Sequence, residues 1–415
     1  MDIAAALPHT TADDITPLAT AAQALLDPSG LGPIDRVPLI PEAARRRHHV
    51  FVPADHRFKA AARFLQALWR EDRGLAMGTH VNRREPHRPR RLGSRISTAA
   101  GALGVNFLHP DIVPVVTRAL AYREPGAAYD IDRLKTNLLS SQPLAFNLFG
   151  LLARDPQLAT RFVTEFLPGT LTEVMDVLFE HSPGRGDPRF TADRTAYDVV
   201  LRGRDATGAS SLICIEIKYS EPGHEPAPPP HPRHTQIAHA TPSLFVDPDA
   251  PTLTSATCQQ FFRQHCLASA MLTAGLADTA TLVFIAPAHN QSAHTAAATY
   301  RRHLTDPQTG TVPFVPTTLE HAFAAMATAG LPDHARALHR RYTDWWLVDG
   351  ELDLAAAAAV AASTSHTFTL PSPAVLTKAR GPVGKASPSN GGTAVRTPHG
   401  PYRARTTTSA ADIAA

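Results

Sequence analysis

Residues 212–219, LICIEIKY, have the length and apolar content of a buried β-strand, yet they include Glu216 and Lys218. Lysine is rare in this chain, since only five of its 40 basic residues are Lys and the others are Arg. A basic residue placed in this strand by composition alone would more often be arginine. Because side chains alternate across a strand, Glu216 and Lys218 point to the same face. Glu216 and Lys218 are therefore candidate residues of a catalytic site.

A second acidic residue lies in the preceding strand-like run, which would form a hairpin with this strand. Asp198 lies in the strand-like run TAYDVVL at 195–201, and the intervening turn is GRDATG at 203–208. If the hairpin is centred near Thr207, Asp198 and Glu216 are directly opposite, with their Cβ atoms ~5 Å apart. A one-residue slip in register would separate them. The spacing therefore predicts two carboxylates that can share one cation.

Two such carboxylates repel each other unless positive charge lies between them. Lys218 supplies part of that charge, and Mg²⁺ or Mn²⁺ suits the remaining oxygen ligands, to which the backbone carbonyl of Ile217 could add. Such a site predicts metal-assisted phosphodiester hydrolysis, with Lys218 orienting or deprotonating water and neutralising the transition state. The alternative is a structural Glu–Lys neighbour pair, with Asp198 accepting hydrogen bonds from a turn.

The rest of the chain predicts an α/β fold with a mixed sheet. Helical patterns over 50–165 precede three strand-like runs at 174–180, 195–202 and 211–219. A helix over 256–274, capped by Ser255, and a buried strand at 281–287 follow, and then helices up to Trp346. We expect a flexible arm at 1–45, one domain at 46–350 with its catalytic core at 166–300, and a disordered tail at 351–415. The proline-rich segment 222–233 is either a flap or a tolerated insertion.

Composition and short motifs indicate where the protein is located and which other kinds of site the sequence lacks. Three cysteines form no framework for disulfides, no signal peptide is evident, and the longest apolar run, 354–362, is too short to span a membrane. We therefore expect a soluble cytoplasmic protein. No P-loop, dinucleotide fingerprint or zinc-ligand spacing is present in the sequence. Residues 83–95 contain six arginines and a single glutamate. The arginines either bind phosphate or form a solvated surface.

Several longer strings resemble the PD-(D/E)XK nuclease superfamily, and in particular an uncharacterised prokaryotic branch that is similar to restriction endonucleases. The strings are LGSR at 92–95, NFL at 106–108, NLLSSQPLAFNLFG at 137–150, FEHSPGR at 179–185, DRTAYD at 193–198 and EIKYSE at 216–221. The resemblance covers roughly residues 50–350. It implies a restriction-endonuclease-like αβββαβ core behind an N-terminal helical extension.

The resemblance also implies roles for individual residues. Asp198 and Glu216 would be metal ligands and Lys218 the catalytic lysine. Some relatives add an acidic residue before the first strand and a glutamine on the helix after the Glu-x-Lys strand. Glu180, with Glu173 as a weaker choice, and Gln260 match these positions, although Glu180 could instead pair with a nearby arginine and Gln260 could be a solvated helix residue.

These features predict a Mg²⁺-dependent DNA endonuclease of the restriction or defence type. Two alternatives stay open: a non-catalytic nucleic-acid-binding module on the same fold, and a repair or recombination nuclease that acts on ends or flaps. The sequence does not distinguish DNA from RNA or identify a recognition sequence. Cleavage of both strands of a palindrome would require a homodimer.

Overall fold

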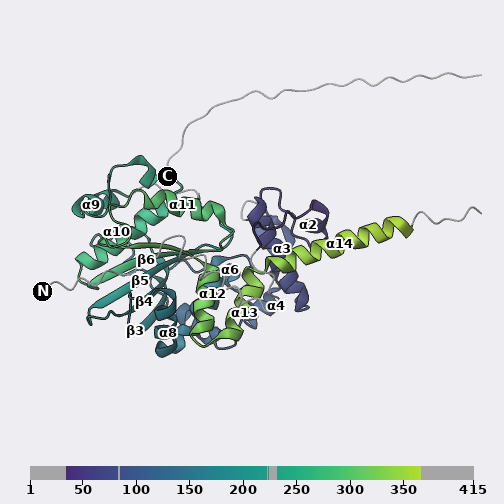
Figure 1. Ribbon diagram of the computed structural model, residues 1–415, viewed down its shortest axis with the longest axis horizontal. Coiled ribbons are helices and arrows are strands. Elements are labelled where there is room, and N and C mark those ends of the chain that lie inside the picture. Colours follow the sequence, from purple (N-terminus) through teal and green to yellow (C-terminus); the bar gives the residue numbers. More distant parts are fainter. Residues whose placement is uncertain (1–33, 83–84, 222, 224–230, 366–415) are drawn as a thin grey trace, which may run out of the picture. The chain divides into compact units, whose positions relative to one another are not determined.

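A five-stranded mixed sheet forms the centre of the computed structural model, which describes residues 34–82, 85–221, 223 and 231–365 (Figure 1). Its strand order is β3-β4-β5-β6-β7. The first three strands pair antiparallel with one another. β6 then pairs in parallel with β5, and β7 pairs in parallel with β6. The strands are β3 (Glu173–His181), β4 (Tyr197–Arg204), β5 (Ser210–Ile217), β6 (Thr279–Ala286) and β7 (Phe314–Thr318). With α8 before β3 and α10 before β6, this arrangement contains the predicted αβββαβ core and confirms the fold class.

The β4–β5 hairpin has the register that the sequence predicts. Val199 pairs with Ile215 at one end and Arg204 with Ser210 at the other, so Thr207 is the centre of symmetry. Asp205 closes the turn, because its Oδ1 atom accepts hydrogen bonds from the backbone amides of Thr207 and Ala209 at 2.8 and 3.0 Å. Gly208 has φ +83°, a backbone conformation that favours glycine. Turn chemistry and strand alternation therefore agree on one register.

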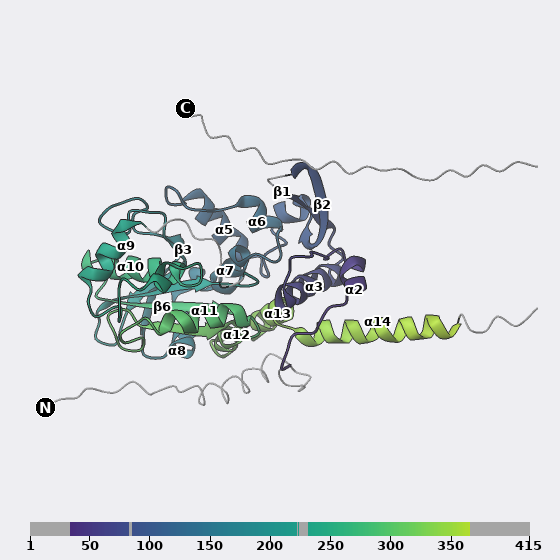
Figure 2. The same cartoon turned by 90° about the horizontal axis from the view of Figure 1, so that it is seen from above.

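Helices cover both faces of the sheet (Figure 2). One face of β5, with Ile213, Ile215, Ile217 and Tyr219, belongs to a core that includes residues of α3, α7, α8, α12 and α13. The opposite face, with Leu212 and Cys214, packs in a second core with residues of α9, α10 and α11. The ranges of these helices are α3 (Arg57–Asp72), α7 (Ser141–Phe149), α8 (Pro156–Phe166), α9 (Pro232–Ala240), α10 (Gln259–Thr273), α11 (Gln291–Arg301), α12 (Leu319–Thr328) and α13 (Pro332–Tyr342).

The remaining elements are short, apart from the last helix. They are α2 (Glu42–Arg47), α4 (Thr98–Ala102), α5 (Ile112–Ala121), α6 (Ile131–Thr136), η1 (Leu152–Arg154), η2 (Pro251–Thr254) and α14 (Trp345–Ser365). Pro143 lies in the first turn of α7, as the sequence predicts, and Ser140 caps this helix by accepting a hydrogen bond from the amide of Gln142 at 3.2 Å. No helix among the described residues combines the length and apolar character needed to cross a membrane.

A buried polar network fixes the end of β5. The Gln66 side-chain amide donates to the Tyr219 hydroxyl at 3.0 Å, and that hydroxyl donates to the Tyr342 carbonyl at 3.3 Å. The fully buried Arg341 guanidinium donates to the Asn106 carbonyl at 2.6 Å and to Gln66 Oε1 at 3.3 Å. Because Tyr219 directly follows Lys218, this network restrains the backbone that carries the lysine.

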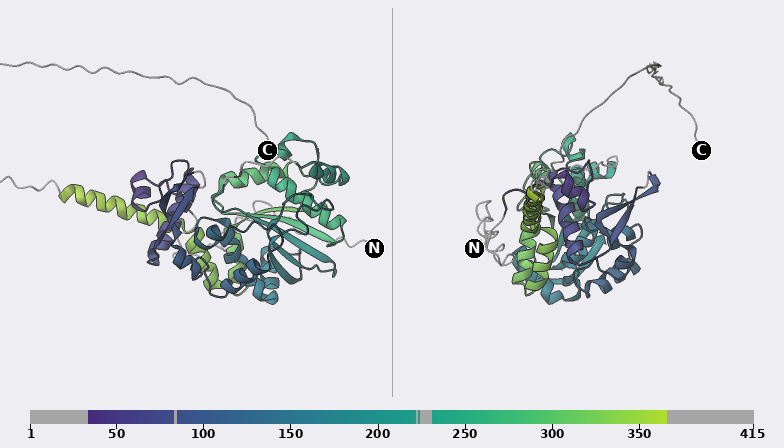
Figure 3. Two further views of the ribbon diagram at one scale, coloured as in Figure 1. Left: turned by 180° about the vertical axis from the view of Figure 1, so that it is seen from behind. Right: turned by 90° about the vertical axis from the view of Figure 1, so that its right-hand side faces the viewer.

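The expectation of helices alone over residues 50–165 is wrong, because a β-hairpin lies within that range. Its strands are β1 (Met77–Asn82) and β2 (Glu85–Ile96), which pair antiparallel with register shifts (Figure 3). The arginine-rich sequence of β2 lacks the apolar alternation that identifies a strand. Tertiary packing supplies the missing specificity: a Cβ at Gly93 would lie 2.1 Å from the His48 carbonyl oxygen, so only glycine permits this approach.

Three other expectations differ from the structure. The expectation of helices alone between the 281–287 strand and Trp346 misses the short β7, which carries Pro316 and pairs with β6. Ser255 does not cap α10, which begins at Gln259 after Cys258; the Ser255 hydroxyl instead donates to the Thr252 carbonyl at 2.7 Å. Residues 351–365 continue α14 and are not a disordered tail, because alanine favours helix even without large apolar groups.

Parts of three expected segments lie outside the described residues. They are residues 1–33 of the N-terminal arm, residues 222 and 224–230 of the proline-rich segment, and residues 366–415 of the tail.

Candidate active site

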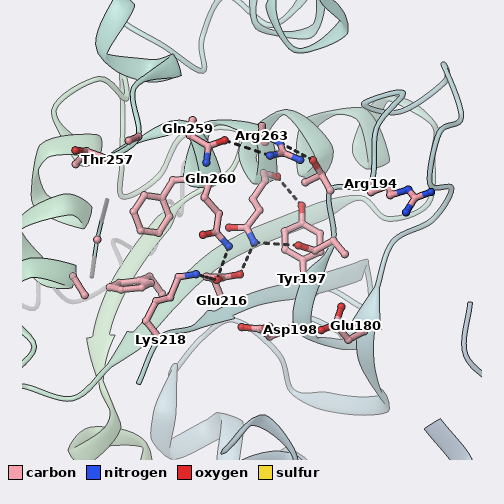
Figure 4. Close-up of a pocket in the computed structure, with 18 residues that line it drawn as sticks. Glu180, Arg194, Tyr197, Asp198, Glu216, Lys218, Thr257, Gln259, Gln260 and Arg263 are labelled. Carbon is pink, nitrogen blue, oxygen red and sulfur yellow. Dashed lines mark hydrogen bonds and ion pairs between the residues drawn. The ribbon is translucent and has the colours of Figure 1, made fainter. Parts of the chain in front are cut away.

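Three acidic residues lie at one level across three neighbouring strands. Leu178 and Phe179 of β3 pair with Val200 and Val199 of β4, and the same register places Glu180 opposite Asp198. The β4–β5 register, continued by one residue beyond Val199 and Ile215, places Asp198 opposite Glu216. The structure thus brings together the three predicted acids, and Figure 4 shows them along one cleft.

Lys218 lies beside this row on the same strand face as Glu216. Its Nζ atom is 3.0 Å from Glu216 Oε1, and its side chain is 14% exposed. The same face carries Leu212 and Cys214, while Ile217 and Tyr219 belong to the core on the opposite side. The amine is therefore held at the cleft by strand geometry, as the sequence predicts.

Two glutamines of α10 hold the Glu216 carboxylate. Gln260 Nε2 donates to Glu216 Oε1 at 2.6 Å, and Gln264 Nε2 donates to Oε2 at 2.7 Å. Gln264 also donates to the Ala196 carbonyl at 3.1 Å, which connects Glu216 to the start of β4. A carboxylate that is only 4% exposed needs such donors to remain stable. Gln260 is where the resemblance predicts it, whereas Gln264 was missed, although its spacing of four residues places it on the same helix face.

Asp198 completes the centre of the row. Its Oδ2 atom accepts a hydrogen bond from the Ile217 backbone amide at 2.8 Å. Burial, and after it the nearby Glu216 and Glu180 carboxylates, raise the pKa of Asp198 well above its usual value. Burial and the Glu216 carboxylate likewise raise the pKa of Glu180. The site thus holds more negative charge than Lys218 neutralises, and it favours either a proton or a bound cation.

The backbone of Glu180 is strained, with φ +49°. Hydrogen bonds surround the residue: Arg185 donates to its carbonyl, Gln142 Nε2 donates to its Oε1 atom at 3.4 Å, and Tyr129 donates to the carbonyl of Phe179 at 3.2 Å. Arg185 is itself paired with Glu124, which also accepts from the Ser182 amide at 2.9 Å. These contacts impose a conformation that directs the Glu180 carboxylate into the row.

Two nearby candidates lie apart from the acid row. Glu173 pairs with Arg204 at the far end of β3, so it does not line the cleft. Arg263, one turn after Gln260, forms an ion pair with Asp193 at 2.8 Å and donates to Thr195 Oγ1 at 3.2 Å. Arg263 therefore stabilises residues 193–195, which lead into β4.

The cleft above the acids has a volume of about 320 Å³. Its other lining groups include Arg194, Thr257 and Gly223. Among the described residues, no three His, Cys, Asp or Glu side chains form a cluster that could hold a metal ion by themselves. Asp198 and Glu216 still fit a magnesium-type ion, because Mg²⁺ is commonly held by one or two carboxylates together with waters and substrate phosphates. The surplus of buried negative charge supports this fit.

An antiparallel meander extended by a helix and a parallel strand, with Asp198 on its second strand and Glu216-Ile217-Lys218 on its third, defines a restriction-endonuclease-like fold. The chain belongs to the PD-(D/E)XK nuclease superfamily, whose family model matches residues 53–344. Members of this superfamily are generally phosphodiesterases that act on nucleic acids and typically use divalent metals. No curated protein and no solved structure gives a significant match to the chain.

The double glutamine contact to Glu216 leads to a testable expectation. Gln264→Leu removes the donor to Glu216 Oε2, and we expect cleavage activity to fall, or the required Mg²⁺ concentration to rise, by about 10–100-fold. The KM for the nucleic-acid substrate should change little, because Gln264 is buried behind the carboxylate. Initial rates over a Mg²⁺ titration would measure this effect.

Gln259→Leu on the same helix is the matched control, since Gln259 contacts Arg263 at 3.3 Å and makes no contact with Glu216. If both variants had the Mg²⁺ dependence of wild type, Gln264 would have no positioning role.

Proposed function

We propose that the protein is a Mg²⁺-dependent endonuclease that hydrolyses DNA phosphodiester bonds in restriction or defence. The observation that carries the proposal is the row Glu180–Asp198–Glu216 with Lys218 3.0 Å from Glu216, in a cleft of a superfamily of phosphodiesterases. A purely structural Glu–Lys pair does not account for two further acids whose pKa values are raised by burial and by each other.

Asp198 and Glu216 would hold the ion, with the Ile217 carbonyl as a further oxygen ligand. A bound Mg²⁺ would supply a water of lowered pKa and would stabilise negative charge on the phosphate. The Lys218 amine, fixed by Glu216, would donate a hydrogen bond to the attacking water or to a non-bridging phosphate oxygen as charge grows there. In the reaction, the attacking water loses a proton to solvent and its oxygen bonds to phosphorus, one P–O ester bond breaks, and the leaving oxygen gains a proton from solvent.

The other residues of the site would position these groups. Gln260 and Gln264 hold the Glu216 carboxylate from one side, and the Ile217 amide holds Asp198 from the other. Glu180 would add negative charge beside Asp198 and strengthen the attraction for a cation. Because the acids lie on paired strands and the glutamines on one helix, the arrangement is preorganised.

The choice of DNA and of a restriction or defence role follows from the similarity of the longer strings to the restriction-endonuclease-like branch. Supercoiled plasmid incubated with purified protein and Mg²⁺ tests it: we expect nicked and then linear DNA, and no conversion when EDTA removes the metal. Covalently closed plasmid separates an endonuclease from an enzyme that needs ends or flaps, which would cut only linear or branched substrates. Salt-sensitive binding without metal-dependent cleavage of DNA or RNA would show a non-catalytic binding module instead.

A further inference from the structure

The β1–β2 hairpin carries a basic surface outside the cleft. Its exposed side chains include His87, Arg88, Arg90 and Arg91. The described side chains of the hairpin, at 77–81 and 87–96, include no Asp or Glu. The hairpin projects from the body of the molecule (Figure 3). A projecting ribbon in which arginines outnumber its single acidic residue, Glu85, is well suited to a polyanion.

Two arginines of this surface, Arg88 and Arg91, are available for a ligand. Neither Arg88 nor Arg91 has a carboxylate of any described side chain within salt-bridge distance. Arg90 differs, because its guanidinium donates to the Phe51 carbonyl and helps to hold the hairpin against the preceding loop. Among the described side chains, Arg88 and Arg91 therefore form no ion pair that would compete with a bound phosphate.

The root of the hairpin is rigid. Arg95, which is 6% exposed, is 2.7 Å from the Asp132 carboxylate and 3.0 Å from Thr136 Oγ1 of α6. The Leu138 amide donates to the Ser94 carbonyl at 3.1 Å. The hairpin therefore has a fixed orientation relative to α6 and to the loop that follows it.

The same segment of chain contacts the acid row. Directly after Leu138, the start of α7 provides Ser141, which donates to Glu221 at 3.1 Å, and Gln142, which donates to Glu180 at 3.4 Å. Glu221 accepts the backbone amide of Tyr219, next to Lys218, at 2.8 Å. Hairpin and cleft are thus anchored on one continuous segment, residues 132–142, so a ligand held by the hairpin is held at a fixed place relative to the site.

We propose that the β1–β2 hairpin is a DNA-binding arm, in which Arg88 and Arg91 contact the phosphate backbone of duplex DNA whose cleavage occurs at the acid row. The inference rests on the proposed function. The planar guanidinium matches phosphate oxygens with paired donors, and the major groove of B-DNA admits a two-stranded β-ribbon. Contacts to phosphate increase affinity without reading sequence, so the arm positions the substrate and does not select it.

Binding of a duplex oligonucleotide tests the arm separately from catalysis. In full-length protein with Lys218→Ala and no divalent ion, fluorescence anisotropy would compare this parent with Arg88→Glu/Arg91→Glu over a range of salt concentrations. Loss of two phosphate contacts is expected to weaken binding at least about tenfold and to reduce the slope of log affinity against log salt by about 2. Arg88→Lys/Arg91→Lys should bind nearly as the parent does, because the charge remains.

The matched control is Arg302→Glu/Arg336→Glu, which changes net charge equally just after α11 and on α13. If the control and the arm variant bind alike, whether both weakened or both unchanged, the arm proposal is overturned. Cleavage distinguishes this result from failure of the proposed function. With Lys218 intact, the arm variant should keep the kcat of wild type and raise the KM for DNA. If wild type binds DNA through the arm without cutting it, the nuclease proposal fails and the arm proposal stands.

Discussion

Lys218→Ala is expected to lower the rate of Mg²⁺-dependent DNA cleavage by at least about 10³-fold, because the variant loses the amine that stabilises developing charge and orients water. The loss should appear in kcat and leave DNA affinity nearly unchanged, since one ammonium within the cleft is a small part of a phosphate-contacting surface. The fold should survive, because the lysine is partly exposed and the adjacent Tyr219 keeps its own hydrogen bonds.

Single-turnover cleavage of supercoiled plasmid by equal concentrations of wild type and variant measures this effect. Lys59→Ala is the matched control: Lys59 lies in the first turn of α3, away from the residues that line the cleft, and should retain full activity. Lys218→Arg separates two roles of the amine, because arginine keeps the charge and cannot lose its proton. Equal cleavage by wild type and Lys218→Ala would remove the lysine from the mechanism.

The sequence was most informative where local chemistry and hydrophobic pattern agree. Asp205 and Gly208 specify one turn, and the alternation in 212–219 specifies one face, so the position of Asp198 opposite Glu216 followed from counting residues. The same alternation correctly separated Glu216 and Lys218 from Ile217 and the core behind it. Local rules of this kind need no knowledge of distant contacts.

The sequence was least informative where distant contacts determine the structure. The β1–β2 hairpin depends on the approach of Gly93 to the His48 carbonyl, and β7 depends on pairing with β6 in spite of Pro316. Neither interaction leaves a periodic pattern. Residues 351–365 show the reverse case, in which helix propensity prevails over a composition that was read as disorder.

The candidate site divides in the same way. The resemblance suggests Glu180 as an additional acid, but its alignment with Asp198 requires the β3–β4 register and a backbone φ of +49° that Arg185 supports. The role of Gln264 depends on the position of α10 over β5, which places two glutamines of the helix on one carboxylate.

Asp198→Asn should have two opposite effects, one on activity and one on stability. Loss of a metal-binding carboxylate is expected to reduce cleavage by at least about 10³-fold. Without divalent ions, however, the variant should be more stable than wild type, because the raised pKa of Asp198 shows that burial and the neighbouring acids disfavour its charged form. Asparagine removes this repulsion and can still accept the Ile217 amide through its side-chain oxygen.

The stability difference between metal-free wild type and Asp198→Asn depends on pH in a definite direction. A carboxyl whose pKa is higher in the folded than in the unfolded state destabilises the fold increasingly as pH rises above its unfolded value, ~4 for aspartate. The thermal midpoint of the metal-free wild type should therefore lie below that of Asp198→Asn at pH 7, by about 2–4 °C for each kcal/mol of relieved repulsion, and the difference should vanish as pH falls toward ~4. Thermal melts in EDTA measure this difference.

Added Mg²⁺ should reverse the order of the two proteins. Wild type gains stability because the ion binds only the folded state, and Asp198→Asn gains little. Asp176→Asn is the control: Asp176 lies on β3 and forms an exposed ion pair with Arg202, so its replacement should leave the metal-induced shift intact. If wild type showed no Mg²⁺ or Mn²⁺ stabilisation at any pH while Asp198→Asn was no more stable than wild type in EDTA, the three acids would not form a cation site, because repulsion among them is what the ion must relieve.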